Sequence, residues 1–316
     1  MASPKKKSGL SRVFRLVIAV AAMALVAFLL HRILSRYSLD EILQSMRSIP
    51  VFRVVLSLIC AAASYLCLTA FDWLALRYVE KPLPYRYVAL ASFCSLSLGH
   101  SIGFAALSSG AIRYRFYSRW GVGIGDIAKI VLFCGVTVGL GLIILAGIAL
   151  LLNSALASEM TTLPHQLILF IGCTCLAVAP LYVALARFVR TPIRFRDWSI
   201  QLPHWRLALA QVFIGPLNFV FVSACLYHAL ASLGDVSYLQ VATAYVIGLA
   251  GSLIAHAPGG LGVLETVVMF LLPGQQLIGG LVAFRVIYFL VPLCIGAPLF
   301  ALAELMFRRS TPATAR

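Results

Sequence analysis

Long apolar runs alternate with short polar segments along the whole chain. Six uninterrupted runs are long enough to cross a bilayer, which takes about 20 helical residues. They cover residues 13–33, 51–76, 127–152, 164–187, 207–232 and 277–304. Two further runs are interrupted near their middles, 87–107 by LGHSIGF and 239–272 by HAPGGLG. This pattern predicts an all-α polytopic membrane protein with six full transmembrane helices and two runs that break.

The interruptions contain residues that disfavour a continuous helix. Proline removes a backbone donor, and glycine is a poor helix former. Broken backbone is tolerated at membrane depth only where it is buried in protein or lines a wet cavity. We therefore expect the interruptions to form the tips of two re-entrant hairpins, made by Gly99, His100 and Gly103 in the first and by His256, Pro258, Gly259, Gly260 and Gly262 in the second.

Positive charge is unevenly distributed between the runs. The segments 77–86, 108–126 and 187–206 are rich in arginine or lysine, whereas 153–163, 233–238 and 273–276 are not. Because positive loops face the cytoplasm, the two ends of the first interrupted run lie on the same side. The second interrupted run is flanked by 233–238 and 273–276, which are both poor in positive charge. By the same reasoning, it also enters and leaves the membrane on one side. The alternative is an ordinary span at 87–107 followed by an arginine-rich external loop.

The two halves of the chain share a sparse similarity. At an ungapped offset of 156 residues, His100 falls on His256, Gly103 on Gly259, Asp72 on His228 and Lys129 on Arg285. Half-repeats at about 13–155 and 164–305 would then begin on opposite sides of the membrane, as in the inverted repeats of many transporters. Chance coincidence is the alternative. Residues 1–12 and 306–316 would be a basic cytoplasmic N-terminus and a cytoplasmic tail.

Composition supports the membrane class and narrows the chemistry. Hydrophobic residues make up 62% of the 316 residues and charged residues only 11%. The net charge of +15 comes largely from a few loops, which excludes nucleic acid as the expected partner. The eight cysteines lie in apolar segments without zinc-ligand spacing and are expected to be buried. No nucleotide, zinc or nucleophile motif occurs, so no cofactor, metal or catalytic residue is expected.

Ionisable residues at membrane depth are candidates for function because burying them is costly. Glu265 follows the second tip, and Arg285 lies about 12 Å into the next span at 1.5 Å per residue. The two could meet as a substrate site or as a structural salt bridge. Asp72 has a similar alternative, pairing with Arg77 or another loop arginine. For His100 and His256 the alternative is capping of freed carbonyl groups.

The segment SSGAIRYRFYSRW, residues 108–120, interleaves arginines with aromatic residues directly after the first hairpin. Arginine forks suit phosphate oxygens, and aromatic rings suit the lipid headgroup layer. Arg113 and Arg115 are therefore candidates for binding a lipid phosphate. The alternative is a basic loop that only fixes topology.

Three stretches together resemble a known family: SGAIRYRFY at 109–117, HAPGGLGVLE at 256–265 and FDWLALRYVEKPLPY at 71–85. They are similar to the membrane region of the bacterial lysylphosphatidylglycerol synthases, also called multiple peptide resistance factors, and of their stand-alone relatives. Full-length members add a cytoplasmic domain that transfers an amino acid from tRNA to phosphatidylglycerol. We expect that domain to be absent from these 316 residues, so that the chain is a stand-alone membrane half or a fragment of a longer synthase. The resemblance implies the lipid-translocating half, with Asp72, Arg113 and Glu265 in the translocation region.

The expected function is translocation of a phospholipid, such as lysylphosphatidylglycerol, in the bacterial inner membrane, with both termini cytoplasmic. Arg113 and Arg115 would bind the phosphate, while Asp72 and Glu265 would bind a cationic headgroup. One alternative is a membrane subunit or fragment of a synthase that works with a separate soluble domain. Another is an intramembrane enzyme that uses His256 and Glu265 as an acid/base pair. The sequence leaves the lipid, the energy source and homo-oligomerisation open.

Overall fold

The computed structural model describes residues 44, 47–102, 105–154, 158, 164–189, 191, 193–195, 198–254, 262–272 and 277–309. Within them the chain is helical apart from one short antiparallel hairpin, in which Ile193 pairs with Ile200. In the first half the elements are α3 (Val51–Tyr78), α4 (Tyr85–Ile102), α5 (Ala105–Tyr117), the 3-10 turn η1 (Ser118–Trp120) and α6 (Ile124–Leu152). They continue with α8 (His165–Phe188), β1 (Ile193–Phe195), β2 (Trp198–Ile200), α9 (Trp205–Leu230), α10 (Tyr238–Ile254) and α11 (Val263–Leu271). The last are α12 (Leu277–Arg285), the π-helix η3 (Val286–Leu290) and α13 (Val291–Arg309).

Five helical stretches in the described part of the chain are long and apolar enough to cross a membrane. They are α3, α6, α8, α9 and the continuous stretch Leu277–Phe307 formed by α12, η3 and most of α13. These agree with five of the predicted spans. The predicted first span, 13–33, lies outside the described residues. The predicted fold class, an all-α membrane protein, is therefore confirmed.

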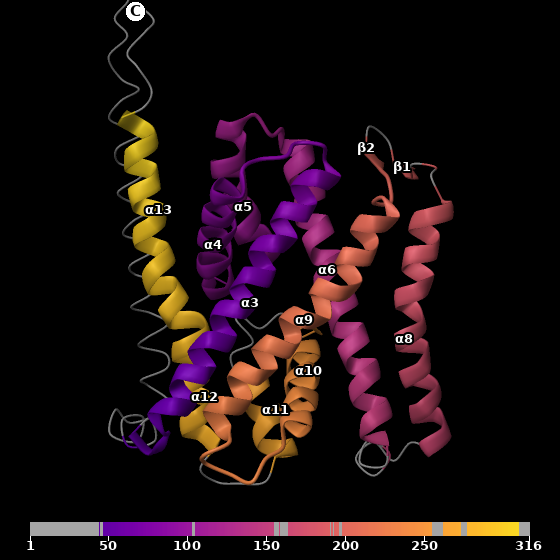
Figure 1. Cartoon of the computed structure of the whole chain (residues 1–316), viewed down its shortest axis with the longest axis vertical. Coiled ribbons are helices and arrows are strands. Elements are labelled where there is room, and N and C mark those ends of the chain that lie inside the picture. Colours follow the sequence, from indigo (N-terminus) through magenta and orange to yellow (C-terminus); the bar gives the residue numbers. More distant parts are fainter. Residues whose placement is uncertain are drawn as a thin grey trace, which may run out of the picture.

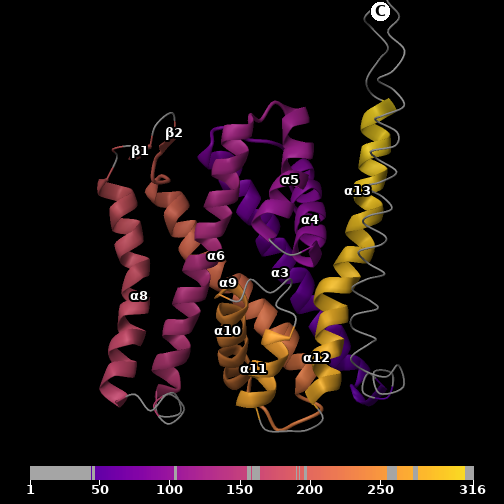
Figure 2. The same cartoon turned by 180° about the vertical axis from the view of Figure 1, so that it is seen from behind.

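The long helices pack around a crossing of α3 and α9 near the middle of the bundle (Figure 1). The Ser64 hydroxyl lies 2.7 Å from Asn218 Oδ1 and 2.8 Å from the Tyr288 hydroxyl, so buried hydrogen bonds join α3, α9 and η3. Seen from behind, α8 and α13 occupy opposite edges of the bundle (Figure 2). Large apolar side chains such as Phe170 and Phe213 remain 68% and 69% exposed. An outer surface of this kind is suited to lipid.

Two pairs of short helices lie between the long ones. α4 and α5 run side by side near the end of the bundle where α3 ends, and α10 and α11 run side by side towards the other end (Figures 1 and 2). The same order of elements therefore occurs twice: a long helix, two short helices and a second long stretch. Each break, at 103–104 and 255–261, lies outside the described residues.

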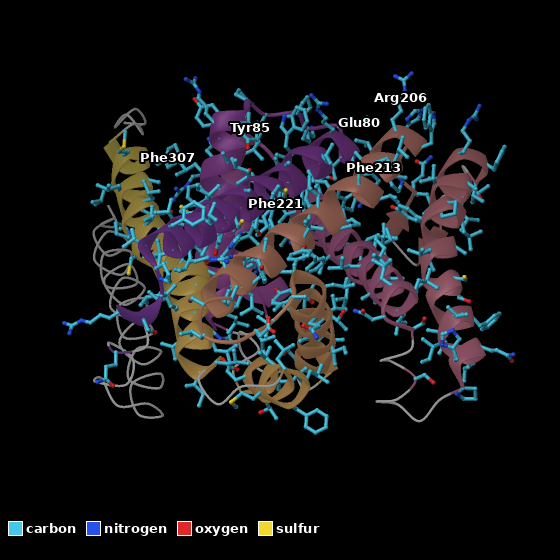
Figure 3. The ribbon with its side chains drawn as sticks, turned by 60° about the horizontal axis from the view of Figure 1, so that its bottom comes forward. Glu80, Tyr85, Arg206, Phe213, Phe221 and Phe307 are labelled. Carbon is cyan, nitrogen blue, oxygen red and sulfur yellow. The ribbon has the colours of Figure 1, made fainter. Side chains whose placement is uncertain are left out.

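The alternative in which residues 108–120 form a basic loop is wrong. α5 continues through Tyr117, and η1 extends the turn to Trp120. The three arginines of this segment pair with the carboxylates of Asp72 and Glu304. Because their charges are paired inside the protein, the helix can pack into the bundle. The α3–α4 turn, the α5–α6 turn and the β-hairpin nevertheless share one end of the bundle, where Figure 3 shows Glu80, Tyr85 and Arg206. The α9–α10 turn lies at the opposite end (Figure 1).

The cysteines are less uniformly buried than predicted. All eight are free thiols, and Cys67, Cys94, Cys134 and Cys225 are buried. Cys173 and Cys294 are exposed on α8 and α13, so the expectation that every cysteine is buried is wrong. Both lie on long apolar helices whose outer faces carry other exposed apolar side chains, where a small apolar residue needs no protein cover.

Candidate functional site

A buried ion pair joins α3 to α5. Asp72, in the last turns of α3, is 0% exposed, and Arg113, on α5, is 3% exposed. Arg113 Nε donates to both carboxylate oxygens at 3.1 and 3.0 Å, and Nη2 donates to Oδ1 at 2.9 Å. This near-bidentate geometry is the strongest form of arginine–carboxylate contact. Asp72 does not pair with Arg77, whose guanidinium lies 3.5 Å from the centre of the Trp73 ring.

Three further side chains complete this first cluster. The Tyr117 hydroxyl donates to Asp72 Oδ2 at 3.0 Å, and Cys134 Sγ of α6 donates to Oδ1 at 3.1 Å. Arg113 Nη1 donates to Ser109 Oγ at 2.8 Å. Residues 109, 113 and 117 lie four apart, so one face of α5 supplies three members of the cluster. The helices α3, α5 and α6 are thereby tied to one carboxylate.

His100 lies in the last turn of α4, next to the first break. Its Nδ1 is buried and has no hydrogen-bond partner among the described residues. Gly99 allows α5 to approach closely, because a Cβ at this position would lie 2.8 Å from Ser109 Cβ. A buried polar atom without a partner costs about 1–3 kcal/mol, so His100 is a strong candidate for contact with a ligand.

A second cluster surrounds the other break. Arg285 Nε, at the end of α12, donates to Glu265 Oε1 at 2.8 Å, and the Gly262 N–H donates to Oε2 at 2.8 Å. The structure thus brings Glu265 and Arg285 together, and Glu265 also caps the first turn of its own helix. Gly262 has φ +86°, a conformation that other residues rarely adopt. The Glu265 carboxylate therefore both stabilises the backbone turn at Gly262 and pairs with Arg285.

One aromatic ring lies against both His100 and Arg285 of the second cluster. Phe289 lies on the π-helix η3, with its ring centre 6.4 Å from that of His100 and 4.9 Å from the Arg285 guanidinium carbon. Single π-turns inside helices occur frequently at functional sites. Phe289 therefore lies between the broken end of α4 and the ion pair of α11 and α12.

Arg115 is paired elsewhere. Its Nε donates to Glu304 Oε1 of α13 at 2.8 Å, and Arg119 Nη2 donates to Oε2 of the same carboxylate at 2.9 Å. The side chains of Arg115 and Arg119 are 25% and 31% exposed, so this third cluster is open to solvent or headgroups. It fixes the end of α13 against α5.

Several predicted site residues cannot be placed. Gly103, His256, Pro258, Gly259 and Gly260 lie outside the described residues. Within the described ranges no group of three or more histidine, cysteine, aspartate or glutamate side chains is arranged to hold a metal ion. The charged candidate residues that the structure describes interact through ion pairs and hydrogen bonds.

The apolar spans and buried ion pairs define a multi-pass membrane protein. Residues 13–296 match the family described as lysylphosphatidylglycerol synthase TM region, and the chain belongs to this family. It is similar to the uncharacterized protein slr0712 of Synechocystis sp. (strain ATCC 27184 / PCC 6803 / Kazusa), with 31% identity over 264 residues, 82% of each chain. It is also similar to the inner membrane protein YbhN of Escherichia coli (strain K12), with 29% identity over 247 residues, 76% of this chain and 77% of the relative.

Sequence reasoning missed Glu304, Tyr117 and Cys134 as partners of the candidate residues. The i, i+4, i+8 spacing of Ser109, Arg113 and Tyr117 would have placed them on one helix face, had the segment been taken as helical. Glu304 is the lone carboxylate of the last apolar run, which was a usable signal. Nothing in the spacing of Cys134 pointed to Asp72.

Proposed function

We propose that this protein is a lipid translocase of the bacterial inner membrane that moves a phospholipid, most specifically an aminoacylated phosphatidylglycerol such as lysylphosphatidylglycerol. Membership of the lysylphosphatidylglycerol synthase membrane-region family supports a phospholipid substrate. The name of the Escherichia coli relative supports the inner membrane. The names of the two relatives state no substrate.

The observation on which the proposal rests is the pair of buried arginine–carboxylate contacts, each attached to a broken helix pair. Asp72–Arg113 joins α5 to α3, and Glu265–Arg285 joins α11 to α12. A buried charge is stable only with a partner. A lipid headgroup that carries both a phosphate and an ammonium can replace both partners at once, with phosphate on arginine and ammonium on carboxylate. The charges then remain paired throughout the exchange.

The other candidate residues fit this scheme. Arg115, partly exposed beside Glu304, would meet the phosphate first at the end of the bundle that carries the basic turns. His100, with an unpartnered buried Nδ1 on the ring that contacts Phe289, would hydrogen-bond the headgroup between the clusters. His256 would act likewise from the second tip.

The topology belongs to the same proposal. α4–α5 and α10–α11 would be re-entrant hairpins from opposite faces, related as an inverted repeat, with the translocation path between them. The repeated order of long helix, two short helices and long stretch supports this arrangement. Under the positive-inside rule, the end with the basic turns faces the cytoplasm, as do both termini.

The proposal is tested by reconstituting the purified chain in proteoliposomes and measuring transbilayer movement of labelled phosphatidylglycerol and lysylphosphatidylglycerol. Protein-dependent movement, faster for lysylphosphatidylglycerol, is expected. No movement of either lipid above protein-free vesicles would reject the proposal.

A second candidate function is suggested by the family description itself, which names a synthase. The chain would then present phosphatidylglycerol to a separate soluble synthase without moving lipid alone. This function predicts that a lipid-modifying enzyme copurifies with the chain and that the purified chain is inactive in proteoliposomes.

A further inference from the structure

A fourth charged group lies at the end of the bundle opposite the basic turns, where α3 begins and α9 ends. Arg53 Nη1 lies 3.2 Å from His228 Nδ1, and the Arg53 guanidinium carbon lies 5.7 Å from the centre of the Tyr227 ring. Both Arg53 and His228 are partly buried. This group belongs to none of the three ion-pair clusters described above.

Within the described ranges, the group presents hydrogen-bond donors without a matching negative charge. Among the described residues no carboxylate lies within ion-pair distance of Arg53. Because a guanidinium can only donate, His228 Nδ1 must accept, which leaves the imidazole neutral with its proton on Nε2. The remaining donors are Arg53 Nε and Nη2 and His228 Nε2–H. A site that offers only donors around a permanent positive charge selects an anion.

The surroundings favour an anion that carries acyl chains. In the first turns of α3, around the helix from Arg53, the side chains of Phe52, Val55 and Ile59 are 68%, 45% and 57% exposed and follow one face of the helix. The start of α3 is also the positive end of the helix dipole, and Pro50 provides no side-chain cap. A phospholipid with its phosphate at Arg53 would find exposed apolar surface for its acyl chains at the same end of α3.

We propose that Arg53 and His228 form a phosphate-binding site at the end of the bundle opposite the basic turns, with the planar guanidinium fork on the phosphate oxygens. The ligand chemistry is a phosphate group, carried by a phospholipid or free in solution. The site concerns binding alone, so it can be tested whatever the outcome of the translocation assay.

The test is native mass spectrometry of the full chain in detergent, titrated with phosphatidylglycerol. Arg53→Gln should weaken the tightest phosphatidylglycerol binding by about tenfold or more, as expected for lost charged hydrogen bonds. Arg47→Gln is the matched control, because Arg47 is an exposed arginine near the start of the same helix. Equal binding by wild type and Arg53→Gln, or equal weakening by Arg47→Gln, would overturn the site.

Two further arms identify the source of the phosphate. Diacylglycerol with the same acyl chains should bind wild type and Arg53→Gln equally, because it lacks the phosphate that Arg53 recognises. If Arg53→Gln weakened diacylglycerol binding as much as phosphatidylglycerol binding, the proposal would be overturned. Competition of bound phosphatidylglycerol by millimolar inorganic phosphate supports a free anion as ligand, and its absence supports the lipid. If Arg53→Gln fails to fold, Arg53→Lys must still weaken binding more than Arg47→Lys, since lysine lacks the fork.

Discussion

Asp72 and Arg113 form a fully buried ion pair between a membrane-spanning helix and the second helix of a broken pair, with three arginine–carboxylate hydrogen bonds of 2.9–3.1 Å. Tyr117 and Cys134 donate to the same carboxylate. The pair therefore ties α5 to α3 and holds two opposite charges inside the bundle. Its structural and functional contributions can be separated by experiment.

The structural contribution predicts strong coupling between the two residues. Asp72→Asn or Arg113→Gln alone leaves a buried charge unpaired and should cost about 3–5 kcal/mol of unfolding free energy. The double variant should lose much less than the sum. Chemical unfolding in detergent measures this, with Asp126→Asn as control, because its pair with Lys129 is about one-third exposed at 3.7 Å. Additive losses would show that the two residues do not stabilise one another.

Gly262 is predicted to be intolerant of any side chain. Its φ of +86° should make Gly262→Ala cost on the order of 1–3 kcal/mol and loosen the Glu265 cap. Gly139→Ala is the matched control, because Gly139 lies inside α6 and a Cβ added there would meet nothing within 4 Å. The thermal unfolding midpoints of the two variants compare them directly. A Gly262→Ala protein as stable as Gly139→Ala would contradict the described turn.

The Glu304 cluster should respond to salt in a way that the Asp72 cluster does not. Because Arg115 and Arg119 are partly exposed, Glu304→Gln should cost only about 1 kcal/mol or less, and the loss should shrink at high ionic strength. The loss caused by Asp72→Asn should stay constant. Unfolding curves at low and high salt check this, and a salt-independent loss for Glu304→Gln would contradict the open geometry.

The re-entrant topology predicts which positions share a side of the membrane. Lys81→Cys, in the α3–α4 turn, and Gly123→Cys, an exposed position with extended backbone in the α5–α6 turn, should react with an impermeant maleimide from the same side. Asp235→Cys, in the α9–α10 turn, should react only from the other side. The wild-type chain supplies the background from its native thiols. Labelling of Lys81→Cys and Gly123→Cys from opposite sides would establish an ordinary span between them.

The sequence contained most of the long-range architecture. Apolar run length predicted the five spans that the structure describes, because crossing a bilayer sets a minimum helix length. The pairing of Glu265 with Arg285 was also foreseeable, since a charge buried in apolar surroundings needs a partner and few were available. The family resemblance was correct as well.

Only part of the first cluster was foreseeable: pairing of Asp72 with an arginine of a charged segment was one of two expected interpretations, but Arg113 was not identified as that arginine. An arginine-rich segment has the composition of a loop, and its helical form depends on Asp72 and Glu304, which lie 41 and 189 residues away from Arg113 and Arg115. Such distant partners leave no local pattern. The π-turn that places Phe289 between His100 and Arg285 has no sequence signature either.

The most direct test of the central claim is lysylphosphatidylglycerol translocation by the double variants Asp72→Asn/Arg113→Gln and Glu265→Gln/Arg285→Gln in proteoliposomes. Each removes both charges of a pair and should fold, with Lys129→Gln as the control that retains wild-type movement. The account predicts that both double variants stop moving lysylphosphatidylglycerol. Wild-type movement by either folded double variant would contradict exchange of the buried ion pairs with the headgroup.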